Sequence, residues 1–173
     1  MSGQGYHFSI QPEQADSLMA YDETAILDFT DGLLDCYGER EGACGGYKEW
    51  DVLHRCLSDG TFDPAGGKLP LNRCFLGGRL LVTDGSIVNL VMPDEVCEVA
   101  VALAGLDRNW LRQRFAELFS REYGGVIPAG DVEWYYGLLE GLKGFYQGAA
   151  ERGEAVVFVT DDSLDYFWKS VQG

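Results

Sequence analysis

The residues best suited to chemistry stand close together: Trp50, Asp51, His54 and Arg55 lie within a helix expected over residues 47–58. Side chains three and four positions apart share a helix face, so Asp51 can hold the His54 imidazole or pair with Arg55. A carboxylate that fixes a histidine tautomer is the arrangement that a general base needs. Trp50 adds an aromatic face on which a ligand can stack. These four residues form a candidate binding pocket.

The same stretch also has a structural interpretation. Trp50 and Leu53 can anchor the helix in the core, while Asp51 and His54 satisfy one another or nearby backbone groups. The chain has no HExxH, GxSxG or P-loop pattern that would supply a nucleophile or metal ligands beside them. Because His7 and His54 are its only histidines, a histidine-rich metal site is excluded. We therefore favour the structural interpretation and assign no catalytic residue, metal or cofactor.

Three weaker candidates lie elsewhere in the chain. Arg108, Arg112 and Arg114 form its densest basic cluster; the first two share a helix face and can receive an anion, although such arginines are usually a solvated side. Asp161-Asp162 follows a strand, where open α/β sheets place ligands and where helix caps are also common. The aromatic run Tyr166–Trp168 fits a partner-docking helix or a terminal helix folded onto the body.

The net charge of −15, from 28 acidic and 13 basic residues, restricts the possible partners. A surface of this kind repels nucleic acid and anionic membranes, so neither is expected as a partner. The charge serves solubility alone or steers a basic protein partner. It is also uneven, because residues 1–46 hold one base, Arg40, and nine acids: Glu13, Asp16, Asp22, Glu23, Asp28, Asp31, Asp35, Glu39 and Glu41.

The cysteines and the apolar segments indicate the compartment. The five cysteines are odd in number and include no C-x-x-C pair, which fits neither a zinc site nor a closed disulfide framework. The N-terminus lacks the basic and apolar regions of a secretory signal, and no segment approaches 18 apolar residues. We expect a cytoplasmic protein with reduced thiols.

Alternating strand and helix signals favour an α/β fold. Strands are expected over residues 6–10, 86–92 and 155–160, the last covered on both faces because it lacks polar alternation. Helices are expected to start at Pro12, at Pro93 and after Asp107, whereas glycines break residues 22–46 into a loop. We predict one domain over residues 1–173, an α/β fold with a small mixed sheet and helices on both faces, and an additional C-terminal helix within 161–173.

One long helix is expected over residues 131–152. At helical spacing, its apolar face comprises Trp134, Leu138, Leu142, Phe145 and Ala149. Gly137, Gly141, Gly144 and Gly148 recur along it, and each glycine costs about 1 kcal/mol relative to alanine in a helix. Tight packing against a neighbouring element would offset that cost.

Motifs along most of the chain resemble the YfbM-like family, a group of bacterial domains of unknown function. They are Lys48-x-Trp50-Asp51-x-Leu53-His54 with Gly60 and Pro64, Pro70-Leu71-x-x-Cys74-x-x-Gly77-Gly78, Pro93-x-Glu95-Val96, and Leu142-x-x-Phe145-Tyr146 continuing to Val156. Cys74 stands where the family commonly has a small residue, and the tail after Thr160 is longer than usual. The resemblance implies a mixed sheet layered between helices and no established catalytic residues.

Two hypotheses of function remain. The first is a cytoplasmic interaction protein, of the immunity type that neutralises a basic toxin, which the lopsided acidity and the lack of a catalytic motif favour. The second is a small-molecule-binding domain or enzyme with its pocket at Trp50, Asp51 and His54. An interaction protein needs its acids on one exposed surface, whereas an enzyme needs only a few in a cleft.

Overall fold

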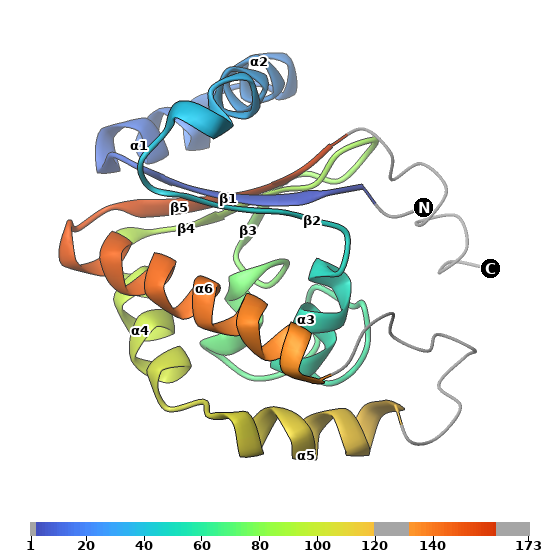
Figure 1. Cartoon of the computed structure of the whole chain (residues 1–173). Coiled ribbons are helices and arrows are strands. Elements are labelled where there is room, and N and C mark those ends of the chain that lie inside the picture. Colours follow the sequence, from blue (N-terminus) through green and yellow to red (C-terminus); the bar gives the residue numbers. More distant parts are fainter. Residues whose placement is uncertain (1–2, 120–131, 162–173) are drawn as a thin grey trace.

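The centre of the fold is a sheet with helices packed on both faces (Figure 1). The computed structural model describes residues 3–119 and 132–161. Within those residues, a five-stranded sheet has the order β2-β1-β5-β4-β3. Its strands are β1 (Gly5–Ile10), β2 (Ala43–Tyr47), β3 (Arg79–Val82), β4 (Val88–Val91) and β5 (Ala155–Thr160). The α/β class and the helices on both faces are thereby confirmed.

The strand directions differ from the expected mixture. All four pairings between the described strands are antiparallel. The reason lies in the connection from β4 to β5, which consists of α4 (Pro93–Ala104), α5 (Arg108–Phe119) and α6 (Val132–Glu151). Since α5 and α6 run in opposite directions, the chain returns to the end of the sheet at which β4 finishes (Figure 1). β5 therefore enters the sheet antiparallel to β4.

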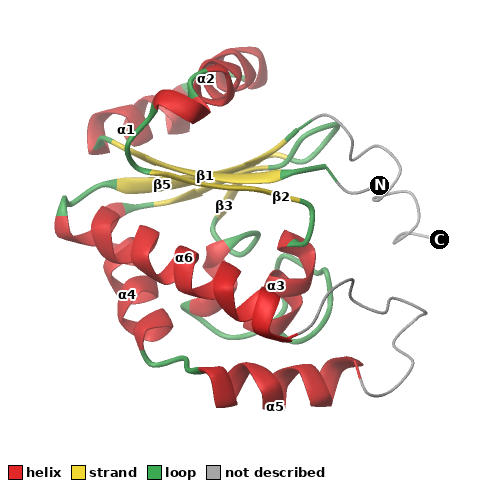
Figure 2. Cartoon of the chain, viewed as in Figure 1, coloured by secondary structure: helices red, strands yellow, loops and turns green. Residues whose placement is uncertain are grey.

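β5 is buried at every position, as its uninterrupted apolar sequence predicts. Val156 and Phe158 point into one core cluster, and Ala155, Val157 and Val159 point into another. The first cluster lies under α3 (Trp50–Leu57), α4, α5 and α6, and the second lies under α1 (Pro12–Ala20) and α2 (Glu23–Asp35) (Figure 2). Successive side chains of one strand thus serve both layers.

The predicted helix starts are confirmed where a capping signal is present. Pro12 and Pro93 occupy the first positions of α1 and α4. The Asp107 carboxylate accepts a hydrogen bond from the Trp110 backbone N–H at 2.8 Å, as an N-cap does. Two short 3-10 helices complete the described elements, η1 (Tyr37–Glu39) and η2 (Leu71–Cys74).

Residues 22–46 are not the loop that their glycines indicate. Asp22 accepts a hydrogen bond from the Ala25 backbone N–H at 2.9 Å and so caps α2, which absorbs the apolar residues of this stretch. The glycines lie farther along, and Gly45 and Gly46 belong to β2 with positive φ angles of 129° and 81°. Because β2 extends to Tyr47, α3 begins at Trp50 rather than at residue 47. β3 was not predicted either.

The long helix buries a side that matches the expected one only in part, at Leu142 and Ala149. Its buried residues are Tyr135, Leu139, Leu142, Tyr146 and Ala149, whereas Trp134 is 55% exposed. Trp134-Tyr135, Leu138-Leu139 and Phe145-Tyr146 are adjacent apolar pairs, so helical spacing alone does not decide which member turns inward. The packing against α4 and the sheet decides it.

Two further expectations concern the ends of the chain and membranes. Asp161 pairs with Gln4 through backbone and side-chain hydrogen bonds of 3.1 and 2.8 Å, which extend the β1–β5 pairing. Asp162, the aromatic run Tyr166–Trp168 and the expected C-terminal helix lie outside the described residues. Among the helices of the described residues, none has the length and apolar content that crossing a bilayer requires.

The glycines of α6 lead to a prediction, because they are not tightly packed. A Cβ added at Gly137 would meet no atom within 4 Å, whereas one at Gly5 would lie 2.8 Å from the Trp50 and Phe158 rings. Gly137→Ala should raise the free energy of unfolding by about 0.5–1 kcal/mol. Gly5→Ala should lower it by about 1–3 kcal/mol through overpacking. Urea denaturation measures both, and destabilisation by Gly137→Ala would contradict the open helix face.

Candidate functional site

Trp50 anchors the core instead of offering a stacking surface. Its side chain is fully buried, and its indole N–H donates to the Gly3 carbonyl at 3.0 Å. Its ring centroid lies 5.4 Å from that of Phe62, 6.1 Å from that of Phe75 and 5.1 Å from that of Phe158. Three different parts of the chain therefore enclose the indole, as the structural interpretation requires.

Asp51, His54 and Arg55 lie on one helix without forming the expected pair. An Asp51 carboxylate oxygen accepts a hydrogen bond from the Val52 backbone N–H at 2.9 Å, and both ring nitrogens of His54 lack a hydrogen-bond partner. Arg55 donates to the Gly60 carbonyl at 3.2 Å just beyond the helix. Burial raises the pKa of Asp51, and the nearby Arg55 charge opposes that rise. The carboxylate therefore does not orient the imidazole.

His54 is wholly buried, and aromatic rings pack around it. Its ring centroid lies 5.9 Å from that of Phe62 and 6.3 Å from that of Phe75. Burial lowers its pKa to about 4, so the imidazole is neutral at pH 7. A base without a described route to solvent and without an orienting carboxylate has no means to exchange protons with a substrate. The geometry of these residues supports a structural role.

His7 provides a comparison on the neighbouring strand. It is fully buried on β1, its Nε2 lies 2.6 Å from the Cys74 carbonyl, and its ring centroid lies 5.0 Å from that of Phe75. Burial lowers its pKa to about 4 as well. The two histidines thus approach Phe75 from β1 and from α3, and only His7 has a hydrogen-bond partner.

The basic cluster on α5 serves to join helices. Arg108 and Arg112 both pair with Glu133 of α6, at 3.2 and 2.9 Å. Arg114 instead donates to the Cys56 carbonyl at 2.9 Å and to the Ser58 carbonyl, which places its charge at the C-terminal end of α3. The first two arginines are therefore neither an anion receptor nor simply solvated.

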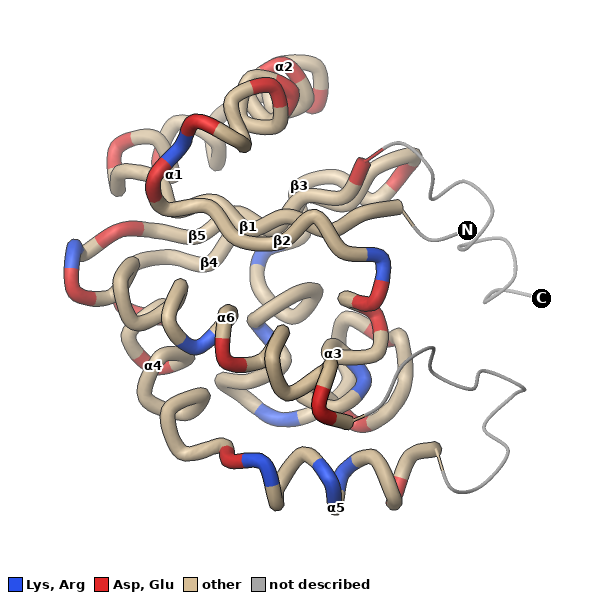
Figure 3. Tube along the Cα trace, viewed as in Figure 1, with Lys and Arg blue, Asp and Glu red and all other residues tan. Residues whose placement is uncertain are grey.

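The acids of the N-terminal region lie together on the α1/α2 layer (Figure 3). All nine are exposed, and none forms an ion pair with a described residue. The guanidinium of Arg40 donates to the Ser9 carbonyl at 2.9 Å, so the single base of this region is turned to the backbone. We define the acidic surface as these residues: Glu13, Asp16, Asp22, Glu23, Asp28, Asp31, Asp35, Glu39 and Glu41.

Two apolar side chains lie exposed within the acidic surface. Met19 is 52% exposed and Tyr21 is 45% exposed, at the end of α1 between Asp16 and Asp22. Ala15 and Leu18 are the buried residues of this helix. Helix α1 ends at Ala20, and Leu18 already fills the inward position. The spacing alone did not reveal this exposed pair.

The comparisons with known proteins were made against family models, solved structures and curated sequences. A model of a domain of unknown function, DUF1877, matches residues 1–159. The chain belongs to the DUF1877 family. The crystal structure of YfbM from Escherichia coli, a protein of unknown function, is similar with a TM-score of 0.58 and 25% identity over 91% of this chain and 99% of that one. No curated protein matches the chain.

The family match confirms the resemblance drawn from the sequence motifs. Of those motif residues, Trp50 and Leu53 are fully buried and Pro93 starts a helix, so these three have structural roles in this chain. Among the residues that the structure describes, no group of three or more His, Cys, Asp or Glu side chains has an arrangement suited to a metal ion. The family description carries no activity to this chain.

His7 has a hydrogen-bond partner, whereas His54 has none among the described residues, and this difference gives a test of their roles in this DUF1877 domain. His54→Leu removes two unpartnered polar atoms, so we expect the free energy of unfolding to stay level or rise by up to about 1 kcal/mol. His7→Leu removes one of two partners of the Cys74 carbonyl, since the Tyr146 hydroxyl also donates to it at 3.3 Å, and should lower the free energy of unfolding by about 0.5–1.5 kcal/mol. Chemical denaturation compares the two, and a large loss for His54→Leu would reveal a partner of that ring.

Acid should destabilise the DUF1877 domain through the same histidines. Their folded pKa values of about 4 lie below the ordinary 6.5, so protons bind more strongly to the unfolded chain. The stability is fully present above pH 6.5 and is lost as the pH falls toward 4. His54→Leu should lose about 1–2 kcal/mol less than the wild type between pH 7 and pH 5. Equal slopes in denaturation across that range would contradict the buried neutral imidazole.

Proposed function

We propose that this protein is a binding protein whose acidic surface docks a basic protein partner. Nine exposed carboxylates without ion pairs, gathered on one helical layer, are the observation that supports it. An immunity-type protein that neutralises a cationic toxin would use such a surface. We place this interaction in the cytoplasm, where the five free thiols would stay reduced.

The electrostatic argument rests on the contrast between the two layers. On the opposite layer, carboxylates pair with arginine or lysine, as Glu95 does with Arg73 and Glu133 with Arg112. On the α1/α2 layer, the like charges repel one another and no described base offsets them. A basic partner would relieve that repulsion, and the field would speed its diffusional approach.

Met19 and Tyr21 supply an apolar contact area, which carboxylates cannot provide. Interfaces commonly consist of an apolar centre, often with Tyr or Met, surrounded by a polar rim. Along the chain the two exposed side chains stand between the acids of α1 and those of α2, so the acidic surface offers apolar as well as charged contacts. The acids would then govern how fast the partner arrives, and the apolar pair how long it stays.

The alternative pocket at Trp50, Asp51 and His54 has less support. Trp50 and His54 are fully buried among aromatic rings, and the cavity beside the C-terminal end of α3 is lined by other residues. A ligand at those side chains would have to displace the core. The interaction function requires no such rearrangement.

The acidic surface can be tested with a charge-matched pair of variants. A tagged full-length protein is used to capture basic partners from its host at low salt, and the partner is purified. Asp28→Asn with Asp31→Asn should slow association by about threefold to tenfold, and added salt should remove the difference. Tyr21→Ala should instead raise the dissociation rate by about tenfold. Surface plasmon resonance separates the two rates.

Asp84→Asn with Asp94→Asn is the control, because both acids are exposed, lie outside the acidic surface and change the net charge equally. This variant should associate at the wild-type rate. Capture of no basic protein, salt-insensitive binding, or equal slowing by both pairs of substitutions would each count against the proposal.

A further inference from the structure

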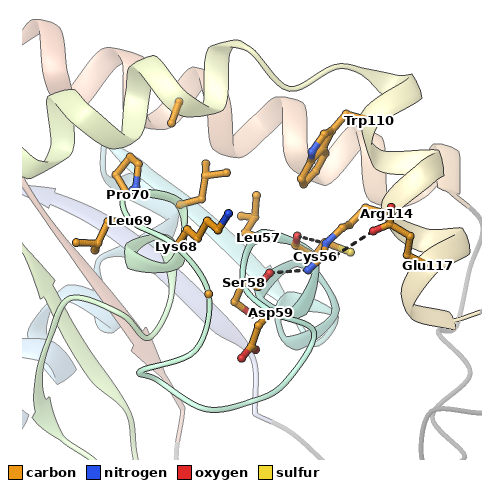
Figure 4. A pocket seen from close by; sticks show the side chains of 13 residues that line it. Cys56, Leu57, Ser58, Asp59, Lys68, Leu69, Pro70, Trp110, Arg114 and Glu117 are labelled. Atoms are coloured by element: carbon orange, nitrogen blue, oxygen red, sulfur yellow. Dashed lines mark hydrogen bonds and ion pairs between the residues drawn. The ribbon is translucent and has the colours of Figure 1, made fainter.

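A cavity of about 830 Å³ lies on the opposite side of the sheet from the acidic surface. It opens between the C-terminal end of α3, the segment 67–71, and the facing sides of α4 and α5 (Figure 4). Its volume is within the range of about 300–1,000 Å³ that is usual for small-molecule sites. None of Trp50, Asp51, His54 and Arg55 lines it.

Arg114 fixes one wall of this cavity. Its Nε donates to the Cys56 carbonyl at 2.9 Å, its Nη2 donates to the Ser58 carbonyl, and its Nη1 pairs with Glu117 at 3.2 Å. All three guanidinium nitrogens are therefore occupied, and they tie α5 to the end of α3. This wall needs no ligand to hold its shape, so the cavity is preformed.

Lys68 supplies a positive charge that no described carboxylate pairs with. The lysine is exposed, and no ion pair joins its ammonium group to a described residue. In Figure 4 its side chain extends toward the space below Trp110. The acids at the cavity are engaged elsewhere, because Asp59 accepts hydrogen bonds from Thr61 at 3.0 and 2.6 Å and Glu117 pairs with Arg114. Asp59 keeps its negative charge, and Lys68 is the lining cation that no described carboxylate pairs with.

Trp110 and several aliphatic side chains supply the apolar part. Trp110 of α5 is half-buried and enters the cavity from the side opposite Lys68 (Figure 4). Leu57, Leu69 and Leu71 line the remaining wall, and Leu69 is 63% exposed. An indole face opposite a lysine ammonium can bind a flat apolar group and an attached anion at the same time.

We propose that this cavity binds a small amphipathic anion. A flat apolar moiety would stack on Trp110, and a carboxylate or phosphate group would pair with the Lys68 ammonium. The site does not depend on the proposed protein partner, because it lies in the other helical layer and uses no residue of the acidic surface. In a chain with a net charge of −15, a local cation beside an aromatic ring selects such a ligand against the general repulsion of anions.

The test uses two fluorescent probes of similar shape on the full-length protein. Anilinonaphthalene sulfonate carries a flat ring system and an anion, whereas N-phenylnaphthylamine has the rings without the charge. Lys68→Gln should weaken binding of the anionic probe by about fivefold and leave the neutral probe unchanged. Trp110→Leu should weaken both by about fivefold. Fluorescence titration at low salt gives the six dissociation constants of the wild type and these two variants.

Lys48→Gln serves as the control, because it removes the same charge at a position that does not line the cavity. It should leave both probes bound as in the wild type. The proposal is overturned if Lys68→Gln leaves the anionic probe unaffected, if Lys48→Gln weakens it equally, or if the wild type binds neither probe. Thermal unfolding of each variant verifies that the fold is retained, and Lys68 is exposed, so its substitution leaves the core intact.

Discussion

The need to cover both faces of β5 governs the rest of this structure. No residue of β5 (Ala155–Thr160) is exposed, and the side chains of this strand point alternately into two separate cores. Burial of that much apolar surface is the dominant stabilising contribution, and it requires a helical layer on each side. The α1/α2 pair supplies one layer. The four helices α3 to α6 supply the other and enclose the ring cluster around Trp50, Phe75 and Phe158.

The two helical layers differ in the surfaces that they expose. α1 and α2 bury a narrow apolar stripe and present a continuous row of carboxylates to solvent. The opposite layer is thicker, pairs several of its charges internally, and leaves a cavity where α5 bridges to the end of α3. The acidic surface and the cavity are therefore on opposite sides of one sheet. The proposed protein partner and the proposed small ligand would thus not compete for the same residues.

The sequence predicted those features that depend on neighbouring residues. Caps at Asp107 and prolines at helix starts are local signals, and they were correct. The sequence also placed Trp50 and His54 on one side of the helix, but it left open whether the histidine turns inward. The sequence could not predict that the two ring nitrogens of His54 have no hydrogen-bond partner among the described residues, because Phe62 and Phe75 come from other parts of the chain. The Asp51–His54 spacing allowed a hydrogen bond that the packed core does not form. Composition revealed the excess of acids, but only the fold shows that α1 and α2 place them on one surface.

The pairing of β1 with β5 also has a consequence for how the protein is made. Gly5 lies opposite Thr160, and Ile10 lies opposite Ala155, so the central contact of the sheet joins the first and last strands. During synthesis from the N-terminus, β1, β2 and the α1/α2 layer emerge early, but the edge of β1 that pairs with β5 waits until nearly all of the described chain has left the ribosome. Contacts between such distant residues close large loops and form slowly. Until then the edge of β1 that β5 will occupy stays unpaired. Completion of the sheet therefore waits for the synthesis of β5.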